Sequence, residues 1–185
     1  MFSHDTLNFF KTHLDQLNTN YLEIGVYRGE SIRDLAIAFP NKTIIGVDPF
    51  IEDGNTTHDS MVAQGGALLT QRELTFDGIK NLTNVKFYEM TSEKFYKELT
   101  PSLIDELNVG SVYIDGSHWY DDVVVDYKLA LDLIGKKSGI VCFDDLHIEG
   151  VVKACNEFIT ICGDRITRRI DLNISNSVFV LKAIA

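Results

Sequence analysis

Hydrophobic positions along the chain change repeatedly between two spacings. Apolar runs at 20–26 and 42–50 have the length and continuity of buried strands. Between them, apolar residues recur at helical spacing over 29–39, until Pro40, which cannot continue a helix. This part of the chain therefore predicts a strand, a helix and a second strand.

The same alternation continues toward the C-terminus. It predicts further strands at 84–90, 111–115 and 138–146, and helices at 3–17, 70–82, 91–99, 120–135 and 150–162. Two final apolar runs at 165–173 and 176–184, joined by a short turn, predict an antiparallel hairpin. Strands that alternate with helices form a parallel sheet covered on both faces. We therefore expect a single α/β domain, 1–185, with a Rossmann-like, mostly parallel sheet of seven strands.

Residues 51–70 interrupt the alternation. The segment is polar, contains glycines and is weakly periodic. So long a connection in a small domain is usually a functional loop or lid. We expect it to close over an acceptor molecule with Asp53, His58 and Asp59; an ordinary surface loop is the alternative.

Net charge and cysteine content indicate which partners and which cellular compartment suit the protein. The net charge of −10 argues against a broad nucleic-acid or membrane contact, and the arginines at 165, 168 and 169 are typical of a solvated face. Three cysteines without metal-ligand spacing fit a reducing compartment. Neither a leader-like segment nor an apolar run of about 18 residues occurs, so we expect a cytoplasmic protein.

The loop after the first strand carries the most informative chemistry. A dinucleotide-binding loop has a second glycine where this chain has Tyr27, whose side chain would crowd a pyrophosphate. Glu23 precedes the loop and suits a cationic amino group or sulfonium. Asp48 ends the second strand about 20 residues later, where an acid accepts hydrogen bonds from ribose hydroxyls. S-adenosyl-L-methionine has these groups and no phosphate.

Three aspartates lie at the ends of neighbouring predicted strands. Asp115 ends the fourth strand, and Asp144 and Asp145 end the fifth. Their carboxylates repel one another unless a cation or protons neutralise them, and oxygen ligands select a hard ion such as Mg²⁺. Structural hydrogen bonding is the alternative. His118 is the candidate general base or a residue that orients Asp115, and His147 is a second candidate base.

The motifs "ExGxxxGxS", "GVDPF", "DGSHxY" and "FDDL" lie between residues 21 and 158. Together they resemble the class I S-adenosylmethionine-dependent methyltransferases, and more narrowly the metal-dependent sugar O-methyltransferases of macrolide and aminocoumarin biosynthesis. The resemblance implies strand order 3-2-1-4-5-7-6 and Mg²⁺ or another divalent metal on Asp115, Asp144 and Asp145. We expect catalysis by His118 and Asp115. The resemblance also implies a cofactor site made by Glu23, Gly25, Val26, Gly29, Ser31, Asp48, Met90, Thr91, Ser92 and Asp115, of which 90–92 border the adenine.

The implied acceptor is a small hydroxylated molecule such as a sugar. Only about 20 residues precede the first strand, so a second copy in a homo-oligomer is expected to complete the acceptor pocket. Three alternatives remain open: a nicotinamide-dependent oxidoreductase, which Tyr27 disfavours; a non-catalytic nucleoside-binding protein on the same fold; and a metal-dependent hydrolase, which leaves Glu23 and Asp48 unexplained.

Overall fold

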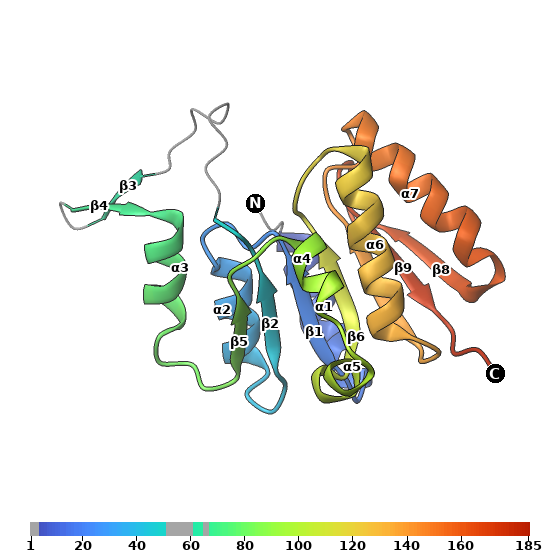
Figure 1. Ribbon diagram of the computed structural model, residues 1–185, viewed down its shortest axis with the longest axis horizontal. Coiled ribbons are helices and arrows are strands. Elements are labelled where there is room, and N and C mark those ends of the chain that lie inside the picture. Colours follow the sequence, from blue (N-terminus) through green and yellow to red (C-terminus); the bar gives the residue numbers. More distant parts are fainter. Residues whose placement is uncertain (1–3, 51–60, 65–66) are drawn as a thin grey trace.

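The computed structural model describes residues 4–50, 61–64 and 67–185. A seven-stranded sheet in the order β5-β2-β1-β6-β7-β9-β8 crosses the molecule (Figure 1), which confirms the predicted order 3-2-1-4-5-7-6. Strands β5, β2, β1, β6 and β7 pair in parallel. Strand β9 pairs antiparallel with both β7 and β8, so within this sheet β9 alone runs in the opposite direction. The strand bounds are β1 (Asn20–Ile24), β2 (Ile44–Val47), β5 (Val85–Tyr88), β6 (Val109–Ile114), β7 (Gly139–Phe143), β8 (Ile166–Asp171) and β9 (Ser177–Leu181).

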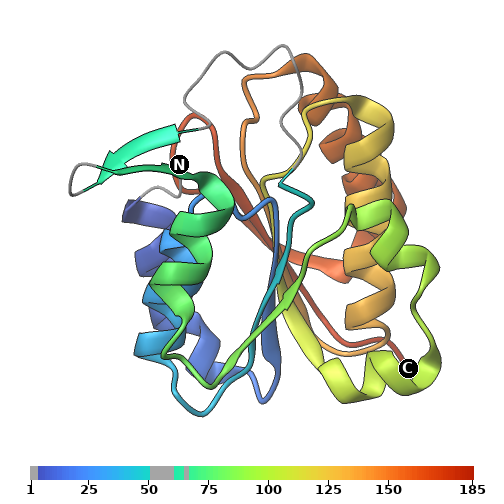
Figure 2. The ribbon, with the colours of Figure 1, turned by 60° about the vertical axis from the view of Figure 1, so that its left-hand side comes forward.

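Helices cover both faces of the sheet, as predicted (Figure 2). One layer is made by α1 (His4–His13), α2 (Glu30–Ala38) and α3 (Gln71–Ile79), and the other by α4 (Ser92–Lys97), α6 (Tyr120–Ile134) and α7 (Glu149–Cys162). Neighbouring strand residues face opposite layers. Tyr21 packs in the cluster of α1 and α2, whereas Leu22 packs in the cluster of α6 and α7. Two apolar cores therefore hold the sheet between them.

Helix boundaries follow local capping chemistry. The predicted helix 3–17 is α1 followed by a 3₁₀ turn, Leu14–Gln16, and residue 3 lies outside the described residues. The predicted helix 70–82 begins with a capping box between Thr70 and Glu73 and ends at Ile79. A further helix, α5 (Pro101–Leu107), was not predicted, although Thr100 caps it and Pro101 occupies its first turn.

The predicted loop 51–70 contains regular structure at its end. Strands β3 (Met61–Gln64) and β4 (Ala67–Thr70) pair antiparallel in a two-stranded sheet that leads into α3. These two short strands were not predicted, and the expectation that 51–70 is a lid stays a prediction. Asp53, His58 and Asp59, the residues expected on the lid, lie outside the described residues.

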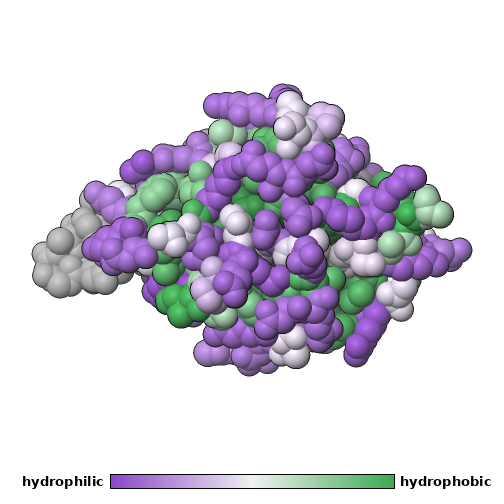
Figure 3. All heavy atoms as spheres, turned by 90° about the horizontal axis from the view of Figure 1, so that it is seen from below, coloured by the Kyte–Doolittle hydropathy of each residue, from purple (hydrophilic) through white to green (hydrophobic). Residues whose placement is uncertain are grey.

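The two ends of the parallel strands differ in what they carry. The face seen from below, where β6 begins after α5, shows polar side chains interspersed with small apolar areas (Figure 3). The loops after β1, β6 and β7 lie at the opposite end (Figure 1). Among the described residues, none of the helices combines the length and apolar character that a membrane-spanning segment needs.

Candidate active site

The loops after β1 and β6 are in direct backbone contact. Gly25 has φ +82°, and a Cβ atom on it would lie 2.0 Å from the carbonyl oxygen of Asp115. The Asp115 amide donates to the Ile24 carbonyl oxygen at 2.9 Å, which extends the β1–β6 pairing to this point. Glycine is required at position 25 because both the backbone angle and the space exclude a side chain. The contact brings the first loop and the end of β6 to one place.

A hollow opens beside this contact; we call it the glycine-loop hollow. It is lined by Glu23, Gly25, Val26, Tyr27, Arg28, Glu30, Ser31 and Asp115. Five of the expected cofactor residues are therefore together. Gly29 is not among them: a Cβ on it would lie 2.8 Å from a methyl carbon of Thr75, so this glycine permits packing against α3. Contact of Gly29 with a ligand stays a prediction.

Glu23 is buried, and two side-chain hydroxyl groups donate hydrogen bonds to it. Only 2% of its surface is exposed, and its carboxylate accepts hydrogen bonds from the hydroxyls of Tyr21, at 2.9 Å, and Ser31. Burial raises the pKa of Glu23 to about 8, although both hydroxyls act in the opposite direction. The sequence prediction named Ser31 and missed Tyr21, which lies two residues earlier on the same strand face.

Asp48 binds the backbone of the first loop. One carboxylate oxygen accepts from the amides of Val26, at 2.7 Å, and Tyr27, at 3.0 Å. The other accepts from the Phe50 amide at 2.7 Å. Asp48 therefore fixes the loop's shape in this structure, and its predicted contact with ribose hydroxyls would use the lone pairs that remain.

The three residues expected around adenine all have structural partners. Thr91 caps α4 by accepting from the Lys94 amide, and Met90 packs against the core cluster of α6 and α7. The Ser92 side chain bonds the carboxyl of Asp126, which is 1% exposed and whose pKa burial raises to about 7. None of 90–92 lines the glycine-loop hollow. Asp126 was missed by the sequence prediction, since it occupies an inward position of α6 where apolar residues were expected.

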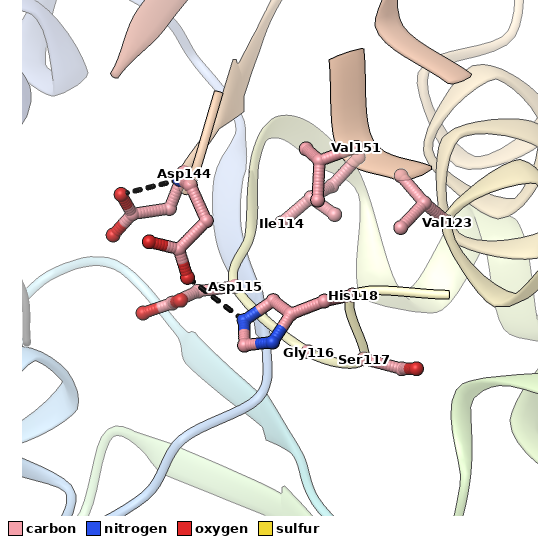
Figure 4. Close-up of a pocket in the computed structure, with 9 residues that line it drawn as sticks. Ile114, Asp115, Gly116, Ser117, His118, Val123, Asp144 and Val151 are labelled. Carbon is pink, nitrogen blue, oxygen red and sulfur yellow. Dashed lines mark hydrogen bonds and ion pairs between the residues drawn. The ribbon is translucent and has the colours of Figure 1, made fainter. Parts of the chain in front are cut away.

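A second hollow lies at the ends of β6 and β7; we call it the aspartate hollow (Figure 4). Its apolar wall is formed by Ile114, Val123 and Val151, and its polar wall includes Asp115 and His118. The full lining is Ile114, Asp115, Gly116, Ser117, His118, Val123, Asp144, Asp145 and Val151. Asp115 lines both hollows, so the two are adjacent through one carboxyl group.

The three expected metal ligands are near one another but differently engaged. Asp144 is buried, and it accepts hydrogen bonds from the Tyr113 hydroxyl and, at 2.7 Å, from the Asp145 amide. Burial, and next the charge of Asp144, raise the pKa of Asp115 well above its usual value. In the described part of the chain, no group of three or more histidine, cysteine or acidic residues is arranged to hold a metal. A metal on Asp115, Asp144 and Asp145 would therefore need these side chains to rearrange.

His118 pairs with Asp145 and not with Asp115, which corrects the alternative role expected for it. Its Nε2 lies 2.8 Å from a carboxylate oxygen of Asp145, and half of its side chain is exposed. His147, the second candidate base, lies farther from Asp145, at 3.7 Å, and contacts the Ser175 hydroxyl at 3.2 Å. Of the two histidines, only His118 lines the aspartate hollow.

The buried Glu23 predicts an unusual pH dependence of stability. A carboxyl whose pKa is about 8 in the folded protein and 4.5 in the unfolded chain binds more protons when folded between those values. Its contribution is therefore fully present below pH 4.5 and lost as the pH rises toward 8. Urea unfolding of Glu23→Gln from pH 5 to 8.5 should show a smaller stability loss than wild type, by on the order of 3 kcal/mol. The exposed Glu98→Gln variant serves as the control, and an equal loss in all three proteins would contradict the assignment.

Comparison with known proteins agrees with this geometry. The model of a family described as methyltransferase domain matches residues 22–146. The O-methyltransferase NovP superposes with a TM-score of 0.70 at 13% identity, covering 96% of this chain and 80% of that one. CalS11, a TDP-rhamnose 3'-O-methyltransferase in calicheamicin biosynthesis, gives 0.64 at 15% identity, with coverage of 97% and 81%. A methyltransferase from Geobacter sulfurreducens gives 0.63 at 11% identity, with coverage of 98% and 80%.

No curated protein matches the chain in sequence. The structural neighbours share its fold at low identity, and the family model covers well over half of its residues. The chain belongs to the methyltransferase domain family and is an S-adenosylmethionine-dependent methyltransferase.

Proposed function

We propose that the protein transfers a methyl group from S-adenosylmethionine to a hydroxyl oxygen of a small acceptor. The observation that supports this most directly is the position of Asp115, which lines both hollows. A cofactor in the glycine-loop hollow would be adjacent to an acceptor in the aspartate hollow. NovP and CalS11, both described as O-methyltransferases, favour oxygen as the receiving atom, and CalS11 favours a sugar-like acceptor.

In this reaction the acceptor oxygen attacks the methyl carbon in line with the departing sulfur. The O–CH₃ bond forms, the S–CH₃ bond breaks, and the hydroxyl proton must leave the acceptor. His118 is suited to accept that proton, because its Nδ1 keeps a lone pair when its Nε2–H is directed at Asp145. The Asp145 carboxylate orients the ring and stabilises the imidazolium that forms.

Four further features of the protein remain predictions. They are a single domain over 1–185, a lid at 51–70, a homo-oligomer that completes the acceptor pocket, and a location in the cytoplasm. A non-catalytic nucleoside-binding protein remains the alternative function. The pairing of a half-exposed histidine with an acid in the second hollow favours catalysis, because nucleoside binding alone has no use for a base there.

Calorimetric titration tests the cofactor. S-adenosylhomocysteine should bind the wild-type protein with a measurable heat and one site per chain, whereas NAD⁺ should give none, since Tyr27 crowds a pyrophosphate. Heat with NAD⁺ alone would overturn the proposed function.

Turnover with a labelled methyl donor and a panel of sugars and catechols tests the base. His118→Gln should lower kcat by about 10²- to 10⁴-fold and leave the dissociation constant of S-adenosylhomocysteine within about twofold. His147→Gln removes a similar imidazole outside the aspartate hollow and should retain most activity. An equal decrease of kcat in both variants would contradict the assignment of His118 as the base.

A divalent metal on Asp115, Asp144 and Asp145 remains a prediction. The Tyr113 hydroxyl would compete with an ion for the Asp144 carboxylate, so Tyr113→Phe should bind Mg²⁺ more tightly than wild type, by about fivefold if one neutral hydrogen bond competes. Mg²⁺-dependent thermal shifts of wild type, Tyr113→Phe and the paired Asp144→Asn, Asp145→Asn variant measure this. Melting temperatures that do not respond to Mg²⁺ in any of the three proteins would refute the metal.

A further inference from the structure

His118 and Asp145, the pair in the aspartate hollow, lie on two loops and not in helices. The loop that carries His118 leads into α6, which begins at Tyr120, and the loop that carries Asp145 leads into α7, which begins at Glu149. The two side chains meet at 2.8 Å, between Nε2 and a carboxylate oxygen (Figure 4). The geometry of this pair therefore depends on how the first turns of α6 and α7 are placed against each other.

The first turn of α7 packs directly against the backbone of His118. A Cβ atom on Gly150 would lie 2.4 Å from the His118 carbonyl oxygen and 3.0 Å from the Tyr120 amide nitrogen. Gly150 is helical and is not among the residues with positive φ, so its backbone angle does not require glycine. Since glycine destabilises a helix relative to alanine, the close approach of the two backbones is the feature that accounts for it.

A second contact joins the two helices farther along α7; we call it the Glu157 clamp. The Glu157 carboxylate accepts hydrogen bonds from the hydroxyls of Tyr120 and, at 2.5 Å, of Tyr127, both on α6. These two bonds hold the pKa of Glu157 below its usual value, so the acceptor is an ionised carboxylate at neutral pH. The Lys153 ammonium lies 3.8 Å from the centroid of the Tyr120 ring. Because hydrogen bonds to a charged acceptor are strong, the clamp holds the start of α6 on α7.

Neither feature contacts the hollows directly. Gly150 and the residues of the Glu157 clamp line neither of them. The first turns of both helices nevertheless contribute to the aspartate hollow, through Val123 of α6 and Val151 of α7. An effect of these features on the reaction would therefore pass through the histidine–aspartate pair and not through contact with a ligand.

We propose that Gly150 and the Glu157 clamp position the base: together they hold α6 and α7 so that the His118 ring stays on Asp145. This rests on the proposed function, because the pair affects the rate only if His118 accepts the proton of the acceptor. A displacement of about 1 Å at a reacting group can lower a rate by about 100-fold, so a small shift of either helix is sufficient. Binding of the cofactor in the glycine-loop hollow does not depend on these contacts.

Gly150→Ala tests the close approach. The added methyl group should displace the first turn of α7, lower kcat by about 10- to 100-fold and leave the dissociation constant of S-adenosylhomocysteine within about twofold. Gly78→Ala is the matched control, because it adds the same group to a glycine of α3 whose Cβ would meet only the Arg33 Cδ atom, at 3.9 Å. The control should keep the kcat of the wild-type protein.

Tyr120→Phe tests the Glu157 clamp. It removes one hydroxyl and keeps the ring beside Lys153, and it should lower kcat by about 3- to 10-fold without a change in cofactor affinity. Tyr96→Phe is the control, since the Tyr96 hydroxyl donates to Asp132 at 2.6 Å and joins α4 to the far end of α6. Loss of that bond should leave kcat unchanged.

A measurement without turnover reports on the pair itself. The proton on Nε2 of His118, hydrogen-bonded to the Asp145 carboxylate, should give a downfield NMR resonance that is assigned by its loss in His118→Gln. In Gly150→Ala and Tyr120→Phe this resonance should move upfield or exchange faster with water. In both control variants it should stay as in the wild-type protein.

Unchanged kcat together with an unchanged Nε2 resonance in Gly150→Ala would overturn the proposal. A loss of cofactor affinity as large as the loss of kcat would also overturn it, since that result indicates a general effect on the fold. If Gly150→Ala does not fold, as judged by circular dichroism and thermal melting, the comparison of Tyr120→Phe with Tyr96→Phe carries the same test. Failure of the wild-type protein to bind S-adenosylhomocysteine would instead refute the proposed function, and the His118 resonance would still decide whether the two features position the pair.

Discussion

The contact between Gly25 and the Asp115 carbonyl is the constraint on which the site depends. It lets the loop after β1 lie directly against the end of β6, where a side chain of any size would hold the two apart. Glu23 and Asp115 are thereby placed in one hollow, and Asp115 also reaches the second. Since Asp48 binds the two amides after Gly25, three parallel strands determine the shape of a single loop.

This close assembly buries acids, and the structure compensates with hydroxyl donors. Tyr21 and Ser31 donate to Glu23, and Tyr113 donates to Asp144. Both tyrosines lie on strands, in the core cluster of α1 and α2. Burial raises the pKa values of both tyrosines, so they remain protonated donors at neutral pH. The same residues therefore fill the core and hold the site's carboxylates.

The strands, the helices and the mostly parallel sheet could be predicted from apolar runs, Pro40 and helical spacing, whereas the strand order was implied by the family resemblance. The hydrogen-bond partners of the site's side chains could not be predicted, because they depend on which residues the folded core brings together. The sequence places Asp48 at the end of the second strand. It does not predict that this carboxylate accepts hydrogen bonds from the Val26 and Tyr27 amides. Ser92 was expected near adenine, but the sequence does not predict that its side chain forms a hydrogen bond with Asp126. Arg28 lines the glycine-loop hollow and was not predicted there, because a charged residue between two glycines also suits a solvated turn.

Charge also connects the two hollows in the proposed reaction. A bound S-adenosylmethionine carries a sulfonium charge that the product lacks, so an ionised acid near the glycine-loop hollow would favour the reactant and oppose transfer. The proton taken by His118 restores a positive charge beside Asp145. In the proposed reaction the positive charge is lost from sulfur in the glycine-loop hollow, and a positive charge forms on the His118 imidazole beside Asp145. Asp115 lies between the two, and its raised pKa means that a neutral carboxyl can occupy that position while the charge on either side changes.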